Sequence, residues 1–181
     1  MRVVVLDTAT KTGWAVLELG VVLPFGLLRL DTDLTKADRG DFQRQPKVLV
    51  SASIQFDALV AEWKSDFIVA ESPHLRGASS FLTVAIYGIA EMTAANHGTG
   101  FYGVRTASWQ SRIIPAPKGV AKAKGDTKLR SVQHVLDLGF DPETDDVADA
   151  LCIAEYVCRE LRLDGQAYEF LPTLSPRRRA A

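Results

Sequence analysis

The sequence predicts an α/β domain in which helices flank a mixed five-stranded sheet, giving three layers. Two observations lead to this prediction. Apolar runs of strand length, bounded by turn-forming residues, occur at five places along the 181 residues. Between and after the later runs, apolar residues recur at helical spacing. The expected order is three strands, helix, strand, helix, strand and two helices, without a linker, a repeat or a second domain.

The first three strands are expected at residues 3–7, 14–19 and 21–30, joined by tight turns. Residues 31–45 are polar, charged and without periodicity, so we expect a loop there. An amphipathic helix should follow, with Pro46 in its first turn, because apolar residues recur at helical spacing up to Trp63. Residues 67–71 form a short apolar run typical of a central strand, and Pro73 ends it.

Residues 79–96 are apolar on most faces of the expected helix, with Ser79 or Ser80 as its cap and Gly98 as its end. Such a helix needs cover on more than one side. It is either a central core helix or also a subunit interface, and the sequence leaves both open. Residues 101–104 predict a fifth strand, and Asp126 predicts the cap of a helix. The last helix is expected at 146–163, which gives a domain over residues 1–165 and a C-terminal tail over 166–181.

The bulk composition argues against a membrane protein and against a disulfide-stabilised one. The only two cysteines, Cys152 and Cys158, lie in one predicted helix, and no signal segment is recognisable at the start. The apolar stretches are far shorter than the roughly 20 residues that a spanning helix needs. We therefore expect an intracellular protein in a reducing compartment.

Charge is unevenly distributed, although the formal net charge is only -1. A basic segment with Asp126 as its single acid contains Arg105, Arg112, Lys118, Lys122, Lys124, Lys128 and Arg130. An acidic block follows just after it and contains Asp137, Asp141, Glu143, Asp145, Asp146 and Asp149. A solvated loop beside a solvated helix start would account for both. The same layout is expected where metal-bound acids act on a polyanion.

Four carboxylates from distant segments are expected to meet at one point. Asp7 ends the first strand, Glu71 ends the fourth, and Asp146 and Asp149 share a face at the start of the last helix. Three of them have a structural alternative: a turn for Asp7, a salt bridge to Arg76 for Glu71, and the helix dipole for Asp146. The dipole explains Asp149 less well, because its apolar neighbours suggest a partly buried position. Together they predict a divalent-metal site, because clustered like charges repel unless a cation lies between them.

These residues carry a resemblance to a known family. The chain resembles the RuvC family of Holliday junction resolvases, in the RNase H-like superfamily, over roughly residues 3–156. The matching motifs are Leu6-Asp7 with Thr12-Gly13-Trp14, Val69-Ala70-Glu71, the small-residue helix around Gly88, the run from Asp146 to Leu151, and Gly125-Asp126-Thr127-Lys128 before the helix with Val132, Gln133 and His134. The pattern is most similar to phage or prophage relatives.

The resemblance implies that Asp7, Glu71, Asp146 and Asp149 are the catalytic carboxylates and that Lys128 lies near the scissile phosphate. They would hold two Mg²⁺ ions, about 3.5 to 4 Å apart, for which Mn²⁺ could substitute. An all-carboxylate set favours magnesium over zinc. The three histidines have no ligand spacing; His97 is expected at a helix end and His134 as an ordinary helix residue. The resemblance further implies a homodimer that nicks four-way DNA junctions in the cytoplasm of a bacterium or a phage-infected host cell.

The expected DNA contacts lie on either side of this cluster. His74 and Arg76 follow Glu71 where the family usually has an inserting aromatic residue, so His74 is the candidate for stacking on a base. Phosphate contacts are expected from Arg105, Arg112, Lys118, Lys122, Lys124 and Arg130. Trp109, among them, either stacks on a base or belongs to the core. A helicase partner is left open.

Other functions fit parts of the pattern. The same acids could cut flapped or branched DNA, or RNA in a hybrid, and a related domain could bind nucleic acid only as a scaffold. A scaffold would have no reason to keep four acids. A sugar-kinase or actin-like nucleotide binder is disfavoured, because the chain has neither a second such domain nor a later glycine-rich phosphate loop.

Overall fold

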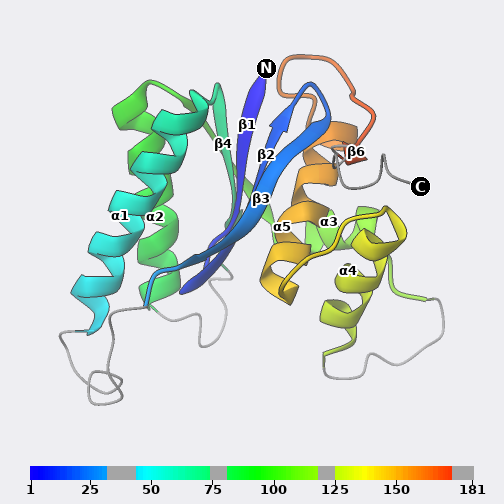
Figure 1. Cartoon of the computed structure of the whole chain (residues 1–181), viewed down its shortest axis with the longest axis horizontal. Helices are drawn as coiled ribbons and strands as arrows, with labels where there is room; N and C mark the ends of the chain where they lie inside the picture. The colour runs from blue at the N-terminus through cyan, green and yellow to red at the C-terminus, as the bar shows by residue number, and fades with distance from the viewer. Residues whose placement is uncertain (32–43, 74–80, 118–124, 173–181) are drawn as a thin grey trace, which may run out of the picture.

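A computed structural model describes residues 1–31, 44–73, 81–117 and 125–172. They form one mixed sheet with the strand order β5-β4-β1-β2-β3-β6 and helices on both of its faces (Figure 1). The elements are β1 (Arg2–Asp7), β2 (Lys11–Glu18), β3 (Val21–Arg29), α1 (Arg44–Trp63), β4 (Phe67–Ser72), α2 (Phe81–His97), β5 (Gly100–Arg105), α3 (Thr106–Ile113), α4 (Asp126–Asp137), α5 (Asp145–Tyr156) and β6 (Leu171–Pro172). The predicted three-layer α/β class is confirmed.

The strand β1 lies at the centre of the sheet and explains its mixed character. It pairs antiparallel with β2, which pairs antiparallel with β3, as expected for strands joined by tight turns. On its other side β1 pairs parallel with β4, and β4 with β5, because a helix crosses over between each of these pairs. The carboxyl ends of β1, β4 and β5 therefore lie at the same end of the sheet.

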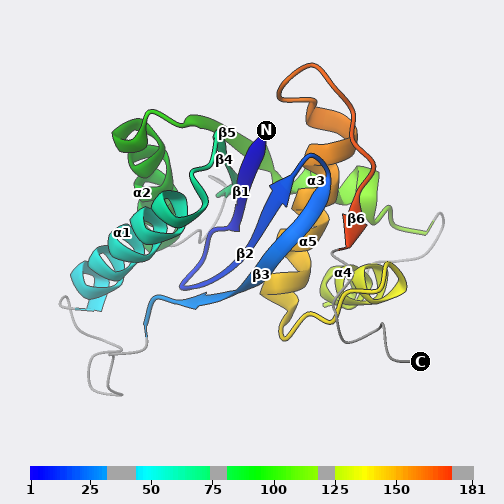
Figure 2. The ribbon, with the colours of Figure 1, turned by 45° about the horizontal axis from the view of Figure 1, so that its top comes forward.

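Two hydrophobic cores follow from the alternation of side chains along the strands. Val4, Leu6, Ile68 and Ala70 are buried against one set of helices, the layer of α1 and α2. The opposite face, with Val3, Val5 and Val69 among its residues, is buried against α5, with α3 and α4 beside it. Figures 1 and 2 show these two helical layers on either side of the sheet. Odd-numbered residues of β1 and β4 thus face α5.

The structure differs from the sequence prediction at three helix positions. The helix α3 was not predicted, because only Trp109 and Ile113 are buried among its residues and its remaining positions are mostly polar. The last helix ends at Tyr156 and continues as a π-helical turn over Val157–Leu161. Asp126 is the first residue of α4 and not its cap, since the N-cap is Gly125 at a positive φ of 87°.

The sixth strand is a further difference from the expected five. It has two residues, and Leu171 pairs with Val21 on β3. Phe170 beside it is 6% exposed and belongs to the core under α5. Phe170, Leu171 and Pro172, which fall within the expected tail, therefore pack on the sheet, and residues 173–181 lie outside the described residues. No helix in the described part of the chain has the length and apolar character needed to cross a membrane.

A buried carboxylate joins α4 to α5. Glu155 is fully buried, and its Oε2 lies 2.5 Å from Nε2 of His134. Its Oε1 lies 2.8 Å from Nη2 of Arg159, one helical turn further along the chain. His134 is thus not the ordinary helix residue expected, because it contributes to satisfying a buried acid. His97 does lie at the end of α2, where Nε2 is 2.6 Å from Oδ1 of Asp57.

Replacing His134 with alanine is expected to lower the free energy of unfolding by about 2 kcal/mol, because Glu155 would lose a charge-assisted hydrogen bond inside the core. Urea denaturation checks this. Gln133→Ala is the matched control, since Gln133 is exposed on the same helix and its side chain donates a hydrogen bond to the exposed Asp137. Equal stabilities for the two variants would contradict the structural role of His134.

Candidate active site

Two of the four predicted acids are brought together by the pairing of β1 with β4. Leu6 lies opposite Ala70 in the parallel register, so the next residue of each strand is an acid, Asp7 on β1 and Glu71 on β4. Because side chains alternate along a strand, both acids face the layer of α5, like Val5 and Val69 before them. The Thr8 hydroxyl donates a 2.8 Å hydrogen bond to the carbonyl oxygen of Glu71, which ties the two strand ends together.

The other two acids approach through a glycine on the neighbouring strand. Gly13 of β2 pairs with Asp7, and a Cβ atom on Gly13 would lie 1.9 Å from the backbone oxygen of Asp146. Only glycine permits this approach, which places the first turn of α5 directly against β2. The turn itself is fixed by Thr144, whose side chain accepts a 3.2 Å hydrogen bond from the amide of Val147. Asp146 and Asp149 follow on this turn.

The protonation of these acids reflects their proximity. The pKa of Asp7 is raised well above its ordinary value, first by burial, then by the charge of Glu71 and a hydrogen bond shared with it, and further by Asp149 and Asp146. Burial likewise raises the pKa of Asp149, to about 7, with Glu71 contributing in the same direction. The pKa of Asp146 is raised by burial and by Asp145. Asp7 therefore lies close enough to the other three predicted carboxylates for each of them to raise its pKa.

The donor set fits a hard divalent cation. It consists of carboxylate oxygens alone, which Mg²⁺ prefers. Oδ1 of Asp149 is buried and has no hydrogen-bond partner within the described residues, so it has a free coordination position. Across the described residues, no group of three or more His, Cys, Asp or Glu side chains is already arranged to hold a metal ion. A bound divalent cation would offset the repulsion between these acids.

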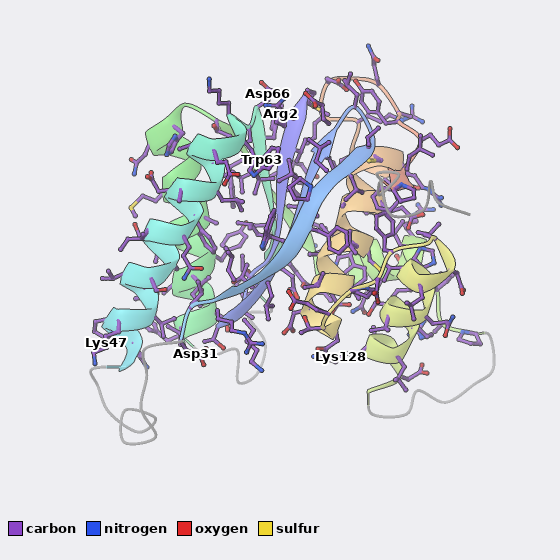
Figure 3. The ribbon with its side chains drawn as sticks, viewed as in Figure 1. Arg2, Asp31, Lys47, Trp63, Asp66 and Lys128 are labelled. Carbon is purple, nitrogen blue, oxygen red and sulfur yellow. The ribbon has the colours of Figure 1, made fainter. Side chains whose placement is uncertain are left out.

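Lys128 lies at the edge of the acid cluster. Its Nζ contacts Asp145 and lies 3.9 Å from Oδ1 of Asp146. The hydrogen bond to Asp145 is the main cause that raises the pKa of Lys128. Figure 3 shows Lys128 where α4 and α5 begin, at the end of the molecule opposite Arg2, Trp63 and Asp66. The positively charged Lys128 ammonium thus lies beside the acids, and 57% of the Lys128 side chain is exposed.

For two residues of this site, the sequence did not predict the contacts that the structure shows. Trp109 is fully buried, so it belongs to the core and is not available to stack on a base. Its Nε1 donates a 3.3 Å hydrogen bond to Oε1 of Glu71. It therefore orients a predicted catalytic acid from α3, an element that carries no clear sequence signal. Asp145, the partner of Lys128, was assigned only to the acidic block, and its position one residue before Asp146 was the available clue.

Comparison with known proteins bears on the fold. No family model and no curated protein matches the chain. RuvC of Thermus thermophilus superposes with a TM-score of 0.61 at 15% identity, over 85% of this chain and 91% of that one. The T. thermophilus RuvC in complex with Holliday junction substrate gives 0.64 at 13% identity, over 93% and 98%. The chain has the RuvC fold. The yeast mitochondrial Holliday junction resolvase Ydc2 shares it, with a TM-score of 0.53 at 12% identity over 84% and 75%.

Within this RuvC fold, the other predicted DNA contacts have different surroundings. Arg105 is exposed at the end of β5, opposite Ser72, and Arg112 is exposed in the last turn of α3. Arg130 is 20% exposed, and its guanidinium contacts Asp126 at 3.1 Å and the carbonyl oxygen of Ile114 at 2.5 Å. The positive charge of Arg130 therefore has partners within the protein and does not require a DNA phosphate. Outside the described residues lie His74, Arg76, Lys118, Lys122 and Lys124.

The raised pKa of Asp149 predicts how the stability of the metal-free RuvC fold depends on pH. The folded chain binds this proton more tightly than the unfolded chain, in which the pKa is near 3.8. The stabilisation is therefore complete below pH 4 and is lost as the pH rises through about 7. We expect a Tm lower by on the order of 5 °C at pH 8 than at pH 5 in EDTA.

Asp149→Asn should make this dependence less steep, because asparagine cannot ionise, while Asp7, whose pKa is also raised, keeps its own contribution. Differential scanning fluorimetry at several pH values makes the comparison. An equally steep pH dependence in the variant would show that other groups cause it.

Proposed function

We propose that this chain is a metal-dependent endonuclease that nicks four-way DNA junctions. The observation that carries the proposal is the electrostatic cluster of Asp7, Glu71, Asp146 and Asp149 at one end of a sheet with the RuvC fold. The solved structures with this fold support the substrate class, because one is a complex with Holliday junction substrate and another is a Holliday junction resolvase. Phosphodiester hydrolysis is chemistry that a carboxylate cluster performs through divalent ions.

Asp7, Glu71, Asp146 and Asp149 would hold two Mg²⁺ ions, with Mn²⁺ able to substitute. When bound, these ions supply activation of a water molecule and stabilisation of the departing 3′ oxygen. The protein would orient the ligands and the substrate. Trp109 orients Glu71, and Lys128, which lies beside Asp146, would offer positive charge to the scissile phosphate. Lys128 must exchange its contact with Asp145 for the phosphate, and the exposure of its side chain permits this.

The substrate and assembly belong to the same proposal. Two nicks placed symmetrically in a junction require two active sites, so we propose a homodimer. Arg105 and Arg112 would contact phosphates near the cluster, which positions DNA without reading its sequence. Phosphate neutralisation of this kind makes binding weaken as salt increases.

The test is cleavage of a labelled four-way junction with Mg²⁺, beside a flap, a plain duplex and an RNA:DNA hybrid. The native chain is compared with Asp146→Asn and with Asp137→Asn, a matched control on the exposed end of α4. Symmetric nicks that are lost in Asp146→Asn but kept in Asp137→Asn are the expected result. Cleavage of only the flap or the hybrid would overturn the junction assignment, and no metal-dependent cleavage at all would overturn the nuclease.

A further inference from the structure

A second feature lies next to the carboxylates, along the free edge of the sheet. β5 is an edge strand, and a groove of about 340 Å³ runs beside it, lined by Tyr102, Gly103, Val104, Arg105, Ser108 and Tyr156. We propose that this groove binds a short stretch of single-stranded DNA adjoining the nucleotide to be cut. The inference rests on the proposed nuclease function and adds a binding subsite to it.

The position of the groove follows from strand register. Val104 pairs with Glu71 and Arg105 with Ser72, so one end of the groove begins at the level of a predicted catalytic acid. Tyr102 lies two residues before Val104 on β5, so the two Cα atoms are about 7 Å apart. Since successive nucleotides are spaced by ~3.4 Å along one strand of a duplex, a DNA strand leaving the carboxylates would reach Tyr102 within about two nucleotides.

The lining of the groove suits unpaired bases. Tyr102 is 43% exposed, so part of its ring is accessible to a ligand in the groove. Tyr156 closes the groove from the end of α5 and is partly buried. Its pKa is raised by burial and then by Tyr102 and Glu160, while Arg112 opposes them, so Tyr102 and Arg112 both lie near its hydroxyl. Aromatic rings stack on bases of any sequence, provided the bases are not paired.

The charge of the groove suits the phosphates between such bases. Arg105 lines it and Arg112 lies beside Tyr156, and neither guanidinium has an ion pair with any residue that the structure describes. Glu160 is the acid recorded near the ring of Tyr156. The Ser108 side chain, at the groove wall, adds a hydroxyl donor. Arginines interleaved with tyrosines are the composition that single-stranded nucleic acid selects.

An edge strand can also accept a peptide strand from another protein chain through its backbone. That mode needs backbone groups and apolar pockets, and it gives no role to two arginines without ion pairs among the described residues. The arginines and the neighbouring carboxylate cluster together favour DNA as the occupant.

The experiment measures anisotropy of a labelled oligothymidine in EDTA, so that neither metal nor cleavage enters the reading. Tyr102→Ala is expected to weaken binding about 10-fold, and Tyr102→Phe by less than about twofold, because phenylalanine retains the stacking face. Arg112→Gln should flatten the slope of log Kd against log salt by about 0.7. The matched control is Lys64→Gln, which removes a positive charge before β4, at the end of the strand opposite Glu71, and should leave the slope unchanged.

Native affinity in Tyr102→Ala, or equal slopes for Arg112→Gln and Lys64→Gln, would overturn the proposal. Altered self-association of Tyr102→Ala in sedimentation, with unchanged DNA affinity, would overturn it in favour of strand addition. Junction cleavage is measured separately with the same proteins. Tyr102-dependent binding without any cleavage would reject the nuclease function and retain the groove, whereas cleavage with Tyr102-independent binding would reject the groove alone.

Discussion

Asp7→Asn is expected to lower metal-dependent cleavage at least about 1,000-fold, which corresponds to ~4 kcal/mol of transition-state stabilisation. Asp7 is the acid on which the other three act, and its pKa is the one raised by all of them. Asparagine preserves the shape of the side chain but removes the charge that a divalent cation needs. Single-turnover cleavage of the labelled junction measures the loss.

The same substitution should stabilise the metal-free protein at pH 8. A partly buried charge that repels its neighbours is replaced by a neutral amide, and relief of such functional strain commonly adds about 1 kcal/mol. Chemical denaturation in EDTA measures this change, and Glu143→Gln, an exposed member of the acidic block, is the control expected to alter neither property. A variant that loses activity together with stability would point to a structural role for Asp7 and against a metal ligand.

Gly13→Ala is expected to remove activity and to lower the free energy of unfolding by about 3 kcal/mol. The added methyl group would lie 1.9 Å from the Asp146 oxygen and 2.4 Å from its carbonyl carbon, both of which are backbone atoms. Neither atom can rotate away, so the start of α5 must move off β2. That movement would carry Asp146 and Asp149 away from Asp7.

The control for this prediction is Gly88→Ala in the middle of α2. A Cβ atom there would meet nothing within 4 Å, and alanine favours a helix over glycine by about 1 kcal/mol. Gly88→Ala should therefore be as stable as the native protein or more so. Urea denaturation and junction cleavage of both variants make the comparison, and an active, stable Gly13→Ala protein would contradict the close approach of α5.

The sequence was sufficient to predict how the acids come together. Asp7 and Glu71 each follow an apolar strand, and parallel neighbours deliver such residues to one end of a sheet. The spacing of Asp146 and Asp149 fixed their common face in the same way. These are local patterns whose spatial meaning follows from strand alternation and helical periodicity.

What could not be predicted depends on contacts without a local pattern. Trp109 reaches Glu71 from α3, a helix with two buried residues and no periodic signal. The contact between Glu155 and His134 joins two helices, and the apolar pattern of neither helix predicts that an acid is buried between them. The strand β6 is too short for a period to be visible, and only the burial of Phe170 marks it.

The assembly of the acid cluster from distant segments has a consequence for how the chain becomes active. Thr8 and Glu71, which hydrogen-bond where β1 meets β4, are separated by 63 positions, and the acids of α5 come much later in the chain. Since a protein is synthesised from its N-terminus, β1 and β4 can pair on the ribosome while α5 has yet to be made. Half of the proposed ligands are then missing. Newly made chains would therefore lack the complete carboxylate cluster until the last helix emerges and docks against Gly13.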